Sequence, residues 1–241
     1  MAHSVDETEA GKARPRTPQA MFDRVAPYYD RFNTLLSMGF DRRWRRRAAR
    51  ALRLPPGARV LDVATGTGAL ARTIVREAPA GVEVVGCDLN ARMLAAGQAQ
   101  RGGGRRPVRL VLAAAERLPF ADDEFDAATI GFAVDDFADQ VAAVRELHRV
   151  VRPGGQLVLL ELSMPDQPLL RAVYRAGLAV FGLVGRLPGR SGYGHLREEI
   201  TRYRGVAAIA DLLGQAGFTG HEVTRLTGGV ATLHRAVNRP G

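Results

Sequence analysis

Short apolar runs alternate along the central part of the chain with segments of helical spacing. The apolar runs occupy residues 58–63, 82–88, 108–113, 125–132 and 156–162, and the helical spacing occupies residues 68–78, 91–100 and 140–151. Strands that are buried on both faces contain few polar residues. Alternation of such strands with helices is typical of a parallel sheet covered on both sides. The pattern therefore predicts a Rossmann-like α/β fold.

The segments that flank this core are predicted to be mostly helical. Residues 19–35 and 38–53 repeat apolar positions every three or four residues, which predicts two N-terminal helices. Residues 165–204 are expected to form a mostly helical insertion that covers the substrate. Residues 1–18 are polar, and we expect a disordered tail there. Residues 19–241 then form a single domain.

The C-terminal part is predicted to complete the sheet. A helix at 206–217 precedes two strand-like runs, 220–226 and 229–237, which a Thr-Gly-Gly turn separates. Such a spacing predicts a hairpin. We therefore expect a seven-stranded, mostly parallel sheet with an antiparallel C-terminal edge strand and helices on both faces.

Composition excludes several classes of protein. Cys87 is the single cysteine, so an internal disulfide and a cysteine zinc site are both excluded, and we predict no metal site. The net charge is +9, but Lys12 is the only lysine among 34 basic residues. Such arginine-biased usage is typical of a GC-rich genome, so the charge alone is weak evidence for a nucleic-acid partner. The start of the chain has no apolar signal region, and we expect a cytoplasmic protein.

A glycine-rich turn follows the first strand, in "LDVATGTGAL" at residues 61–70. Gly66, Gly68 and Ala71 fit the dinucleotide pattern G-x-G-x-x-G/A, in which backbone amides approach a pyrophosphate. Asp62 lies at the end of that strand, where its carboxylate would repel a phosphate. Asp88 ends the second strand, where a carboxylate can accept both hydroxyls of a ribose. S-adenosylmethionine (SAM) explains both acids, because it has a ribose and an ammonium group but no phosphate.

Three stretches resemble the ubiquinone/menaquinone biosynthesis C-methyltransferases, which are class I SAM-dependent enzymes. The stretch "YDRFNTLLSMGFDRRW" at 29–44 resembles the family's N-terminal signature, and "RVVRPGGQLVLLELS" at 149–163 resembles its second one. "LTGGVATLHRA" at 226–236 is similar to the family's C-terminal ending. The resemblance runs from about Met21 to Val237. It implies a class I methyltransferase fold, with SAM as the cofactor.

The resemblance also implies where the cofactor binds. By position, the family's contacts fall on Thr67 in the turn, Asp88 at the ribose, Ala114 and Ala115 beside the adenine, and Gly131 after the fourth strand. Met93 is placed to pack on the adenine, although a methionine there could equally be a core residue. The predicted cofactor-binding residues are Asp62, Gly66, Thr67, Gly68, Asp88, Met93, Ala114, Ala115 and Gly131.

The sequence departs from the family pattern at several positions. Ala114 stands where the family usually has an Asp or Asn that can bond the adenine amino group. Asp41 replaces a histidine of the first signature. Asp135 and Asp136 replace an Arg-Asn pair that faces the quinol, and His195 stands where the family tends to have Tyr.

Methylation of a hydroxylated ring requires a base to remove the phenolic proton. We predict that Asp135 is this base and that Phe132, Phe137 and the charge of Asp136 raise its pKa. His195 is the rival base, and Tyr29 is predicted to orient the hydroxyl group. In the alternative interpretation, Asp135 is a solvated loop residue.

Three functions remain open at this point. The first is C-methylation of a prenylated quinol of the demethylmenaquinol type. The second is methylation of a specialised aromatic metabolite by a related enzyme, which the altered "FAVDDF" segment at 132–137 favours. The third is a non-methylating, cofactor-binding protein on the same fold. Because a prenylated substrate lies in the bilayer, the arginines of residues 42–50 predict a reversible contact with anionic membranes. The oligomeric state and the prenyl length are not determined by the sequence.

Overall fold

The structure is a computed structural model that describes residues 22–23, 26–100, 108–165, 167–172, 174–176 and 205–239. The predicted tail at 1–18 lies outside the described residues, as do His195 and most of the predicted insertion at 165–204. Within that insertion, residues 168–172 and 174–176 are helical, and residue 173 between them is not described.

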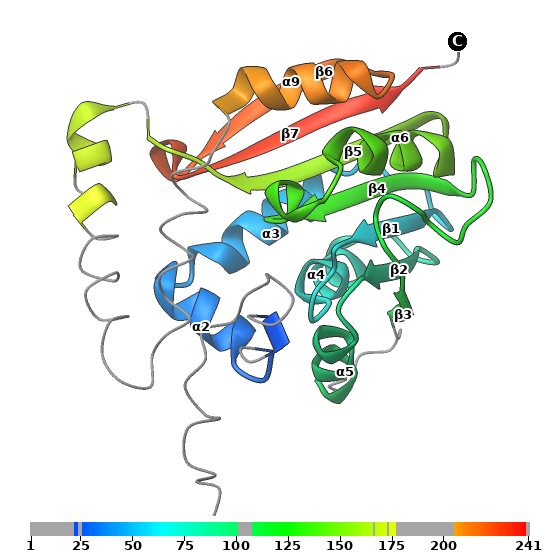
Figure 1. Cartoon of the computed structure of the whole chain (residues 1–241), viewed down its shortest axis with the longest axis horizontal. Helices are drawn as coiled ribbons and strands as arrows, with labels where there is room; N and C mark the ends of the chain where they lie inside the picture. Colours follow the sequence, from blue (N-terminus) through cyan, green and yellow to red (C-terminus); the bar gives the residue numbers. More distant parts are fainter. Residues whose placement is uncertain are drawn as a thin grey trace, which may run out of the picture.

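Seven strands form one sheet in the order β3-β2-β1-β4-β5-β7-β6 (Figure 1). The strands are β1 (Arg59–Val63), β2 (Glu83–Asp88), β3 (Arg109–Leu112), β4 (Phe125–Gly131), β5 (Val151–Leu162), β6 (Phe218–Leu226) and β7 (Ala231–Asn238). Strands β1 to β5 pair in parallel, and β7 runs antiparallel to both β5 and β6. The predicted fold class is confirmed. The antiparallel strand β7 lies one place inside the sheet, and β6 forms the edge.

Helices connect and cover the strands. They are α2 (Tyr29–Leu36), α3 (Phe40–Ala51), α4 (Ala69–Glu77), α5 (Ala91–Ala99), α6 (Gln140–Val150) and α9 (Gly205–Gln215), with one-turn 3-10 helices η1 (Val134–Asp136) and η2 (Thr227–Gly229). The expected single helix at 19–35 is wrong, because 26–28 form a turn before α2 begins. Pro27 has no N–H to donate and disfavours helical backbone in the residue before it, which accounts for the break.

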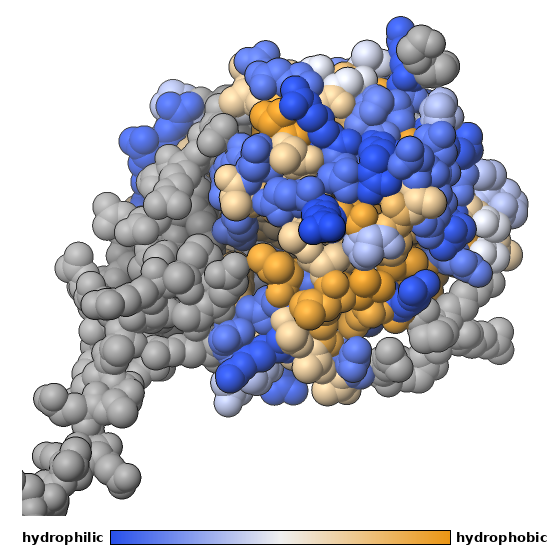
Figure 2. Space-filling view, turned by 45° about the vertical axis from the view of Figure 1, so that its right-hand side comes forward, coloured by the Kyte–Doolittle hydropathy of each residue, from blue (hydrophilic) through white to orange (hydrophobic). Residues whose placement is uncertain are grey.

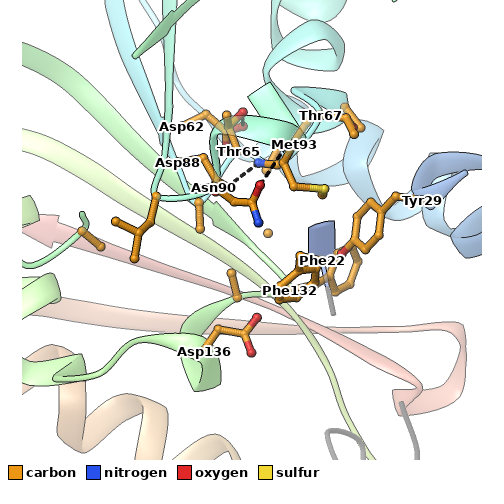
Figure 3. A pocket seen from close by; sticks show the side chains of 18 of the residues that line it. Phe22, Tyr29, Asp62, Thr65, Thr67, Asp88, Asn90, Met93, Phe132 and Asp136 are labelled. Carbon is orange, nitrogen blue, oxygen red and sulfur yellow. Dashed lines mark hydrogen bonds between the residues drawn. The ribbon is translucent and has the colours of Figure 1, made fainter. Parts of the chain in front are cut away.

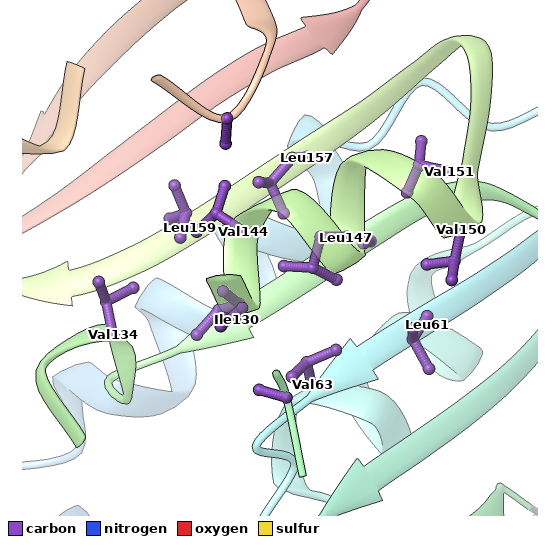
Figure 4. Close-up of a cluster of buried hydrophobic side chains, with 14 of the residues drawn as sticks. Leu61, Val63, Ile130, Val134, Val144, Leu147, Val150, Val151, Leu157 and Leu159 are labelled. Atoms are coloured by element: carbon purple, nitrogen blue, oxygen red, sulfur yellow. The ribbon is translucent and has the colours of Figure 1, made fainter. Parts of the chain in front are cut away.

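Each face of the sheet has its own hydrophobic core. Leu61 and Val63 of β1 point to the face that α6 and α9 cover (Figure 4), whereas Val60 points to the face that α3 and α4 cover. This alternation follows from the two-residue period of a strand. Because both faces are buried, Val60, Leu61 and Val63 are apolar whichever face they point to, and the polar Asp62 is buried among them.

Residues Arg152–Gly155, an Arg-Pro-Gly-Gly segment just before the apolar run at 156–162, lie inside β5. The pairing of β4 with β5 passes from Phe125 opposite Val151 to Ala127 opposite Gln156, so β5 has an irregularity there. Gly154 adopts a φ of +79° within it. The strand therefore begins earlier than its apolar run indicates.

Most of the face seen in Figure 2 is hydrophilic, and hydrophobic residues gather in one area near its middle. The exposed large apolar side chains of the described residues are Tyr28, Leu35, Met38, Leu89, Leu112 and Leu169. Three of these belong to the N-terminal helices or the turns beside them. Among the described residues, no helix has both the length and the hydropathy needed to cross a bilayer.

Candidate active site

A cavity of about 410 Å³ opens at the carboxyl ends of β1, β2 and β4 (Figure 3). Its volume is within the range of small-molecule sites. From β1 the chain adds β2 and β3 on one side, and from β4 it adds β5 on the other, so the strand order reverses between β1 and β4. Ligands of open α/β sheets bind at such a switch point. The N-terminal residues Phe22, Tyr29 and Asp30 close the cavity on the side opposite the sheet.

The glycine turn uses its own amides internally. The N–H of Gly66 donates to Oδ2 of Asp88 at 2.7 Å, and the N–H of Gly68 donates to the carbonyl of Thr65 at 2.8 Å. Both glycines have positive φ, at +57° and +83°, a region that residues with a Cβ rarely adopt. These two amides are therefore not directed at a ligand, in contrast to the pyrophosphate-binding turn that the G-x-G-x-x-A pattern would indicate.

Asp88 presents a fixed carboxylate to the cavity. Its second oxygen, Oδ1, accepts the N–H of Asn90 at 2.8 Å, so one backbone donor holds each oxygen. Burial raises the pKa of Asp88, while the N–H groups of Asn90 and Gly66 oppose the rise. Each oxygen keeps acceptor capacity for a further donor. This arrangement suits the two hydroxyls of a ribose.

Asp62 lies at the bottom of the cavity and is only 1% exposed. Its oxygens accept the hydroxyls of Thr65 and Thr129, each at 2.6 Å, and the N–H of Ala71 at 3.2 Å. Burial raises the pKa of Asp62 to about 6, while these hydrogen bonds oppose the rise. Asp62 thus joins β1, β4 and α4, and its carboxylate adds negative character to the cavity.

Helix α5 approaches the glycine turn closely enough to require a glycine. A Cβ on Gly97 would lie 2.3 Å from the carbonyl oxygen of Thr67, which is far inside van der Waals contact. Asn90 caps α5 by accepting the N–H groups of Arg92 and Met93. Met93 is buried and lines the cavity, and its Cε would lie 3.2 Å from a Cβ on Gly66. The two elements therefore form one rigid wall.

The other residues of the cavity wall on the side of Met93 have small side chains or none. Ala113 and Ala115 line the cavity after β3, whereas Ala114 between them is not part of the lining. Gly131 lines it at the end of β4, where a Cβ would lie 3.1 Å from Leu70. Small side chains on either side leave space for a planar ring. The predicted positions of Met93, Ala115 and Gly131 thus lie together.

Aromatic side chains line the opposite part of the cavity. Phe22 and Tyr29 meet edge to face, with ring centroids 6.0 Å apart, and Phe132 and Phe137 also contribute to the lining (Figure 3). Phe132 has a φ of +63°, a conformation that strains a bulky residue. Its N–H donates to the carbonyl of Leu160 at 2.7 Å, which holds the strained residue in place. An aromatic acceptor fits between such rings.

Both acids after β4 are exposed, and of the two only Asp136 lines the cavity. The Oδ1 of Asp135 accepts an N–H of the Gln140 side-chain amide, at 3.3 Å. The predicted burial of Asp135 is therefore wrong, because Val134 takes the inward position in η1. The contact with Gln140 says nothing about catalysis, so the catalytic role of Asp135 stays a prediction.

Glu161 supports the turn that carries this pair. Its Oε1 accepts the N–H groups of Ala133 and Val134 at 3.3 and 3.2 Å. Burial, with repulsion from Asp135 and Asp136, raises the pKa of Glu161 to about 8. A largely protonated carboxyl group at neutral pH therefore lies behind the acids of η1.

Most predicted site residues lie in one place, and several contributors were missed. Those that line the cavity are Tyr29, Asp62, Gly66, Thr67, Asp88, Met93, Ala115 and Gly131. Gly68 supports the turn from outside the lining. The missed contributors are Phe22, Asp30, Asn90 and Glu161, whereas Phe132 and Asp136 were predicted only as neighbours of Asp135. Asn90 could have been found, because an Asn just before a helical pattern is a capping signal. Within the described residues, no group of three or more acids, histidines or cysteines could hold a metal.

Comparison with known proteins gives close relatives along nearly the whole chain. The family model of the ubiE/COQ5 methyltransferase family matches residues 8–238. A ubiquinone/menaquinone biosynthesis C-methyltransferase of Geobacter sp. strain M21 is 39% identical over 220 residues, which are 90% of this chain and 94% of the relative. A demethylmenaquinone methyltransferase of Mycolicibacterium paratuberculosis is 43% identical over 229 residues, covering 94% and 95% of the two chains.

Solved structures agree on the fold. A SAM-dependent methyltransferase from Thermotoga maritima superimposes with a TM-score of 0.64 at 20% identity, covering 91% of this chain and 98% of the other. The solved structure shows the fold alone, whereas the family match and the two relatives show the family. The chain belongs to the ubiE/COQ5 methyltransferase family.

Proposed function

We propose that this protein transfers a methyl group from SAM to a ring carbon of a hydroxylated quinol in ubiquinone or menaquinone biosynthesis. The observation that carries the proposal is the cavity at the switch point. It holds the Asp88 carboxylate, a glycine turn with its amides already bonded, and an aromatic wall in one space. The family and the named activities of the relatives support the same substrate class.

The described residues fit SAM. Asp88 would bind the ribose hydroxyls, and Met93 with Ala115 would contact the adenine on either side. The carboxylates of Asp62 and Asp88 in the lining favour a cofactor with an ammonium and a sulfonium over one with phosphates. When bound, SAM supplies an electrophilic methyl group on a positively charged sulfur.

The chain's own residues position and activate the acceptor. We infer that the aromatic wall of Phe22, Tyr29 and Phe132 orients the quinol ring. Asp136 is exposed and lines the cavity, so its carboxylate would accept the phenolic proton. Tyr29 would donate a hydrogen bond to the hydroxyl oxygen of the quinol. Loss of this proton gives a phenolate whose ortho carbon is nucleophilic. That carbon would take the methyl group as the bond from methyl to sulfur breaks, which leaves S-adenosylhomocysteine, and the ring carbon would then lose its proton to restore the aromatic ring. Proximity supplies much of the remaining acceleration.

The test is an assay of the purified protein with SAM and demethylmenaquinol. We expect a methylated quinol that forms only when both compounds are present, with one S-adenosylhomocysteine per product. If SAM binds but none of several demethylated quinols is methylated, the quinol assignment is wrong.

A second candidate is supported by Asp136. The cavity has an acid where the family pattern has an Arg-Asn pair, and a changed group at the acceptor favours a changed acceptor. In this case, a related enzyme would methylate another hydroxylated aromatic compound. Turnover of small phenolic compounds in preference to demethylmenaquinol would favour this candidate.

A membrane contact would bring the enzyme to a prenylated substrate. Arginines 42, 43, 46, 47 and 50 are exposed along α3, and Leu35 and Met38 are exposed just before it, at 73% and 83%. Cations near an anionic surface and apolar side chains that enter it both favour peripheral binding. We propose reversible attachment through this part of the protein, weakened by salt.

A further inference from the structure

A second cavity, of about 520 Å³, lies beside the first one on the side of α2, α3 and α4. The two share Asp30, Arg45 and Ala69 as lining residues. Unlike the first cavity, the second is lined mainly by charged groups. Its arginines are Arg31, Arg42, Arg45, Arg46, Arg72 and Arg76, and its acids are Asp30, Asp41 and Glu77.

The acids of this cavity are already paired with arginines of the same cavity. The pairs are Asp30 with Arg72, Asp41 with Arg45, and Glu77 with Arg46. Three arginines then remain: Arg31, Arg42 and Arg76. In the described part of the chain these three have no ion pair, and Arg76 only donates to the Thr73 hydroxyl at 2.9 Å. The cavity therefore carries three positive charges that no described acid neutralises.

The positive charges are close enough to affect one another. Arg72 is half-buried between the two cavities and donates to the carbonyl of Thr67 at 2.5 Å. Burial lowers the pKa of Arg72, Asp30 opposes this, and the positive charges of Arg76 and Arg45 lower it further. An anion in the cavity would relieve this repulsion.

We propose that Arg31, Arg42 and Arg76 form a binding subsite for a phosphoryl group, separate from the cofactor cavity. A guanidinium group presents planar pairs of donors that match the oxygens of a phosphate, and it stays charged at all relevant pH values. Three such groups suit an anion with several oxygens and more than one charge better than a single carboxylate. The cavity is larger than one phosphate, so the phosphoryl group can carry an organic substituent.

Two sources can supply this chemistry, a phospholipid headgroup and a free phosphate compound. Leu35 and Met38 are exposed and lie in the chain between the lining residues Thr34 and Asp41, and Tyr28 is exposed three residues before Arg31. Apolar side chains around a phosphate site favour the headgroup, because they can enter the lipid while the arginines hold the phosphate. The inference concerns binding only and does not depend on methyl transfer.

The direct test is equilibrium dialysis of labelled inorganic phosphate at constant ionic strength. The variant Arg42→Gln/Arg76→Gln removes two arginines of the subsite, and Arg43→Gln/Arg47→Gln removes two exposed arginines of α3 that do not line the cavity. Both variants lose the same charge. We expect saturable binding by the wild type, a loss of at least tenfold in the first variant, and less than twofold in the second.

The second arm uses vesicles of phosphatidylcholine with and without phosphatidylglycerol. Because Arg42, Arg43 and Arg47 all belong to the part of α3 that we propose faces the membrane, both variants lose some of its attraction for anionic vesicles. If the headgroup is the source, Arg42→Gln/Arg76→Gln loses vesicle binding far more than the control, and free phosphate competes only for binding by proteins that keep the subsite. If a free phosphate compound is the source, dialysis separates the two variants and vesicle binding does not. The proposal is overturned if neither arm separates them, because the arginines then act only through net charge. Thermal unfolding of both variants establishes that they are folded.

Discussion

Asp88 is the residue on which cofactor binding depends most. Its oxygens are held by two backbone N–H groups, and it lines the cavity at the end of β2, so Asp88→Ala should raise the Kd of SAM at least tenfold. Hydrogen bonds to a charged group contribute about 1.5–3 kcal/mol, which corresponds to this change or more. Calorimetric titration measures it, with Asp211→Ala on α9 as an exposed control. A change of less than about threefold would show that Asp88 does not bind the ribose.

Asp135 and Asp136 are adjacent in the chain but differ in surroundings, which allows a paired test. Asp136→Asn should lower kcat by about a hundredfold, the low end for a positioned base, with the Kd of SAM unchanged. Asp135→Asn should change kcat less than threefold, because this carboxylate does not line the cavity and bonds to Gln140. Steady-state kinetics on both variants decides between them. The reverse order would assign the base to Asp135, as the sequence predicts.

The sequence analysis predicts Asp135 as the base, whereas Asp136 is the member of the pair that lines the cavity. Which of two neighbouring residues faces a cavity depends on the single turn of η1, and no periodicity can be measured over three residues. Asp62 is a similar case. Its position at the end of β1 was clear, but its bonds to Thr129 and Ala71 connect three elements and follow only from the fold.

At the scale of elements, the contact of α5 with the glycine turn gives a prediction. Gly97→Ala should destabilise the protein by about 1–3 kcal/mol and weaken SAM binding, because its Cβ would lie 2.3 Å from the Thr67 carbonyl. Gly214→Ala on α9 is the matched control, since no atom lies within 4 Å of its Cβ. That variant should be neutral or slightly more stable. Chemical denaturation measures both, and equal effects would contradict the close approach.

The order of strands and helices was predictable because a central strand that is buried on both faces consists mostly of apolar residues. The hairpin of β6 and β7 also followed from its Thr-Gly-Gly turn. Details set by single residues were not predictable in the same way. Pro27 and Gly154 are both local turn signals in the sequence. The chain does turn around Pro27, but at Gly154 the strand β5 continues with an irregularity. Tertiary contacts decide whether such a signal ends an element, and they cannot be read from the local sequence.

The whole molecule should lose stability as the pH rises from 6.5 to 8.5. Glu161 has a pKa of about 8 when folded and an ordinary value of 4.5, so above pH 4.5 the unfolded chain has released a proton that the folded chain keeps. Stability therefore falls with rising pH until about 8, by on the order of 1–2 kcal/mol over this interval.

The effect can be isolated with Glu161→Gln. The pKa of His234 is lowered from 6.5 to about 4 and that of His221 is also lowered, so stability gains slightly as these histidines lose their protons in the unfolded chain near pH 6.5. Asp62, with a pKa of about 6, contributes little above that pH, and all three groups are the same in the wild type and the variant. Urea denaturation at pH 6.5 and 8.5 should show the decrease in the wild type and a much smaller one in Glu161→Gln. Equal slopes would mean that Glu161 is ionised in the folded protein.

We propose that the switch-point cavity brings the methyl group of SAM to a ring carbon of a quinol. The most direct measurement is a single-turnover reaction with SAM labelled with carbon-13 in its methyl group, followed by NMR of the product of demethylmenaquinol. We expect the label on the ring carbon next to a hydroxyl group, and its near absence with Asp88→Ala under subsaturating SAM. Label on a phenolic oxygen, or unlabelled quinol beside bound and unreacted SAM, would contradict it.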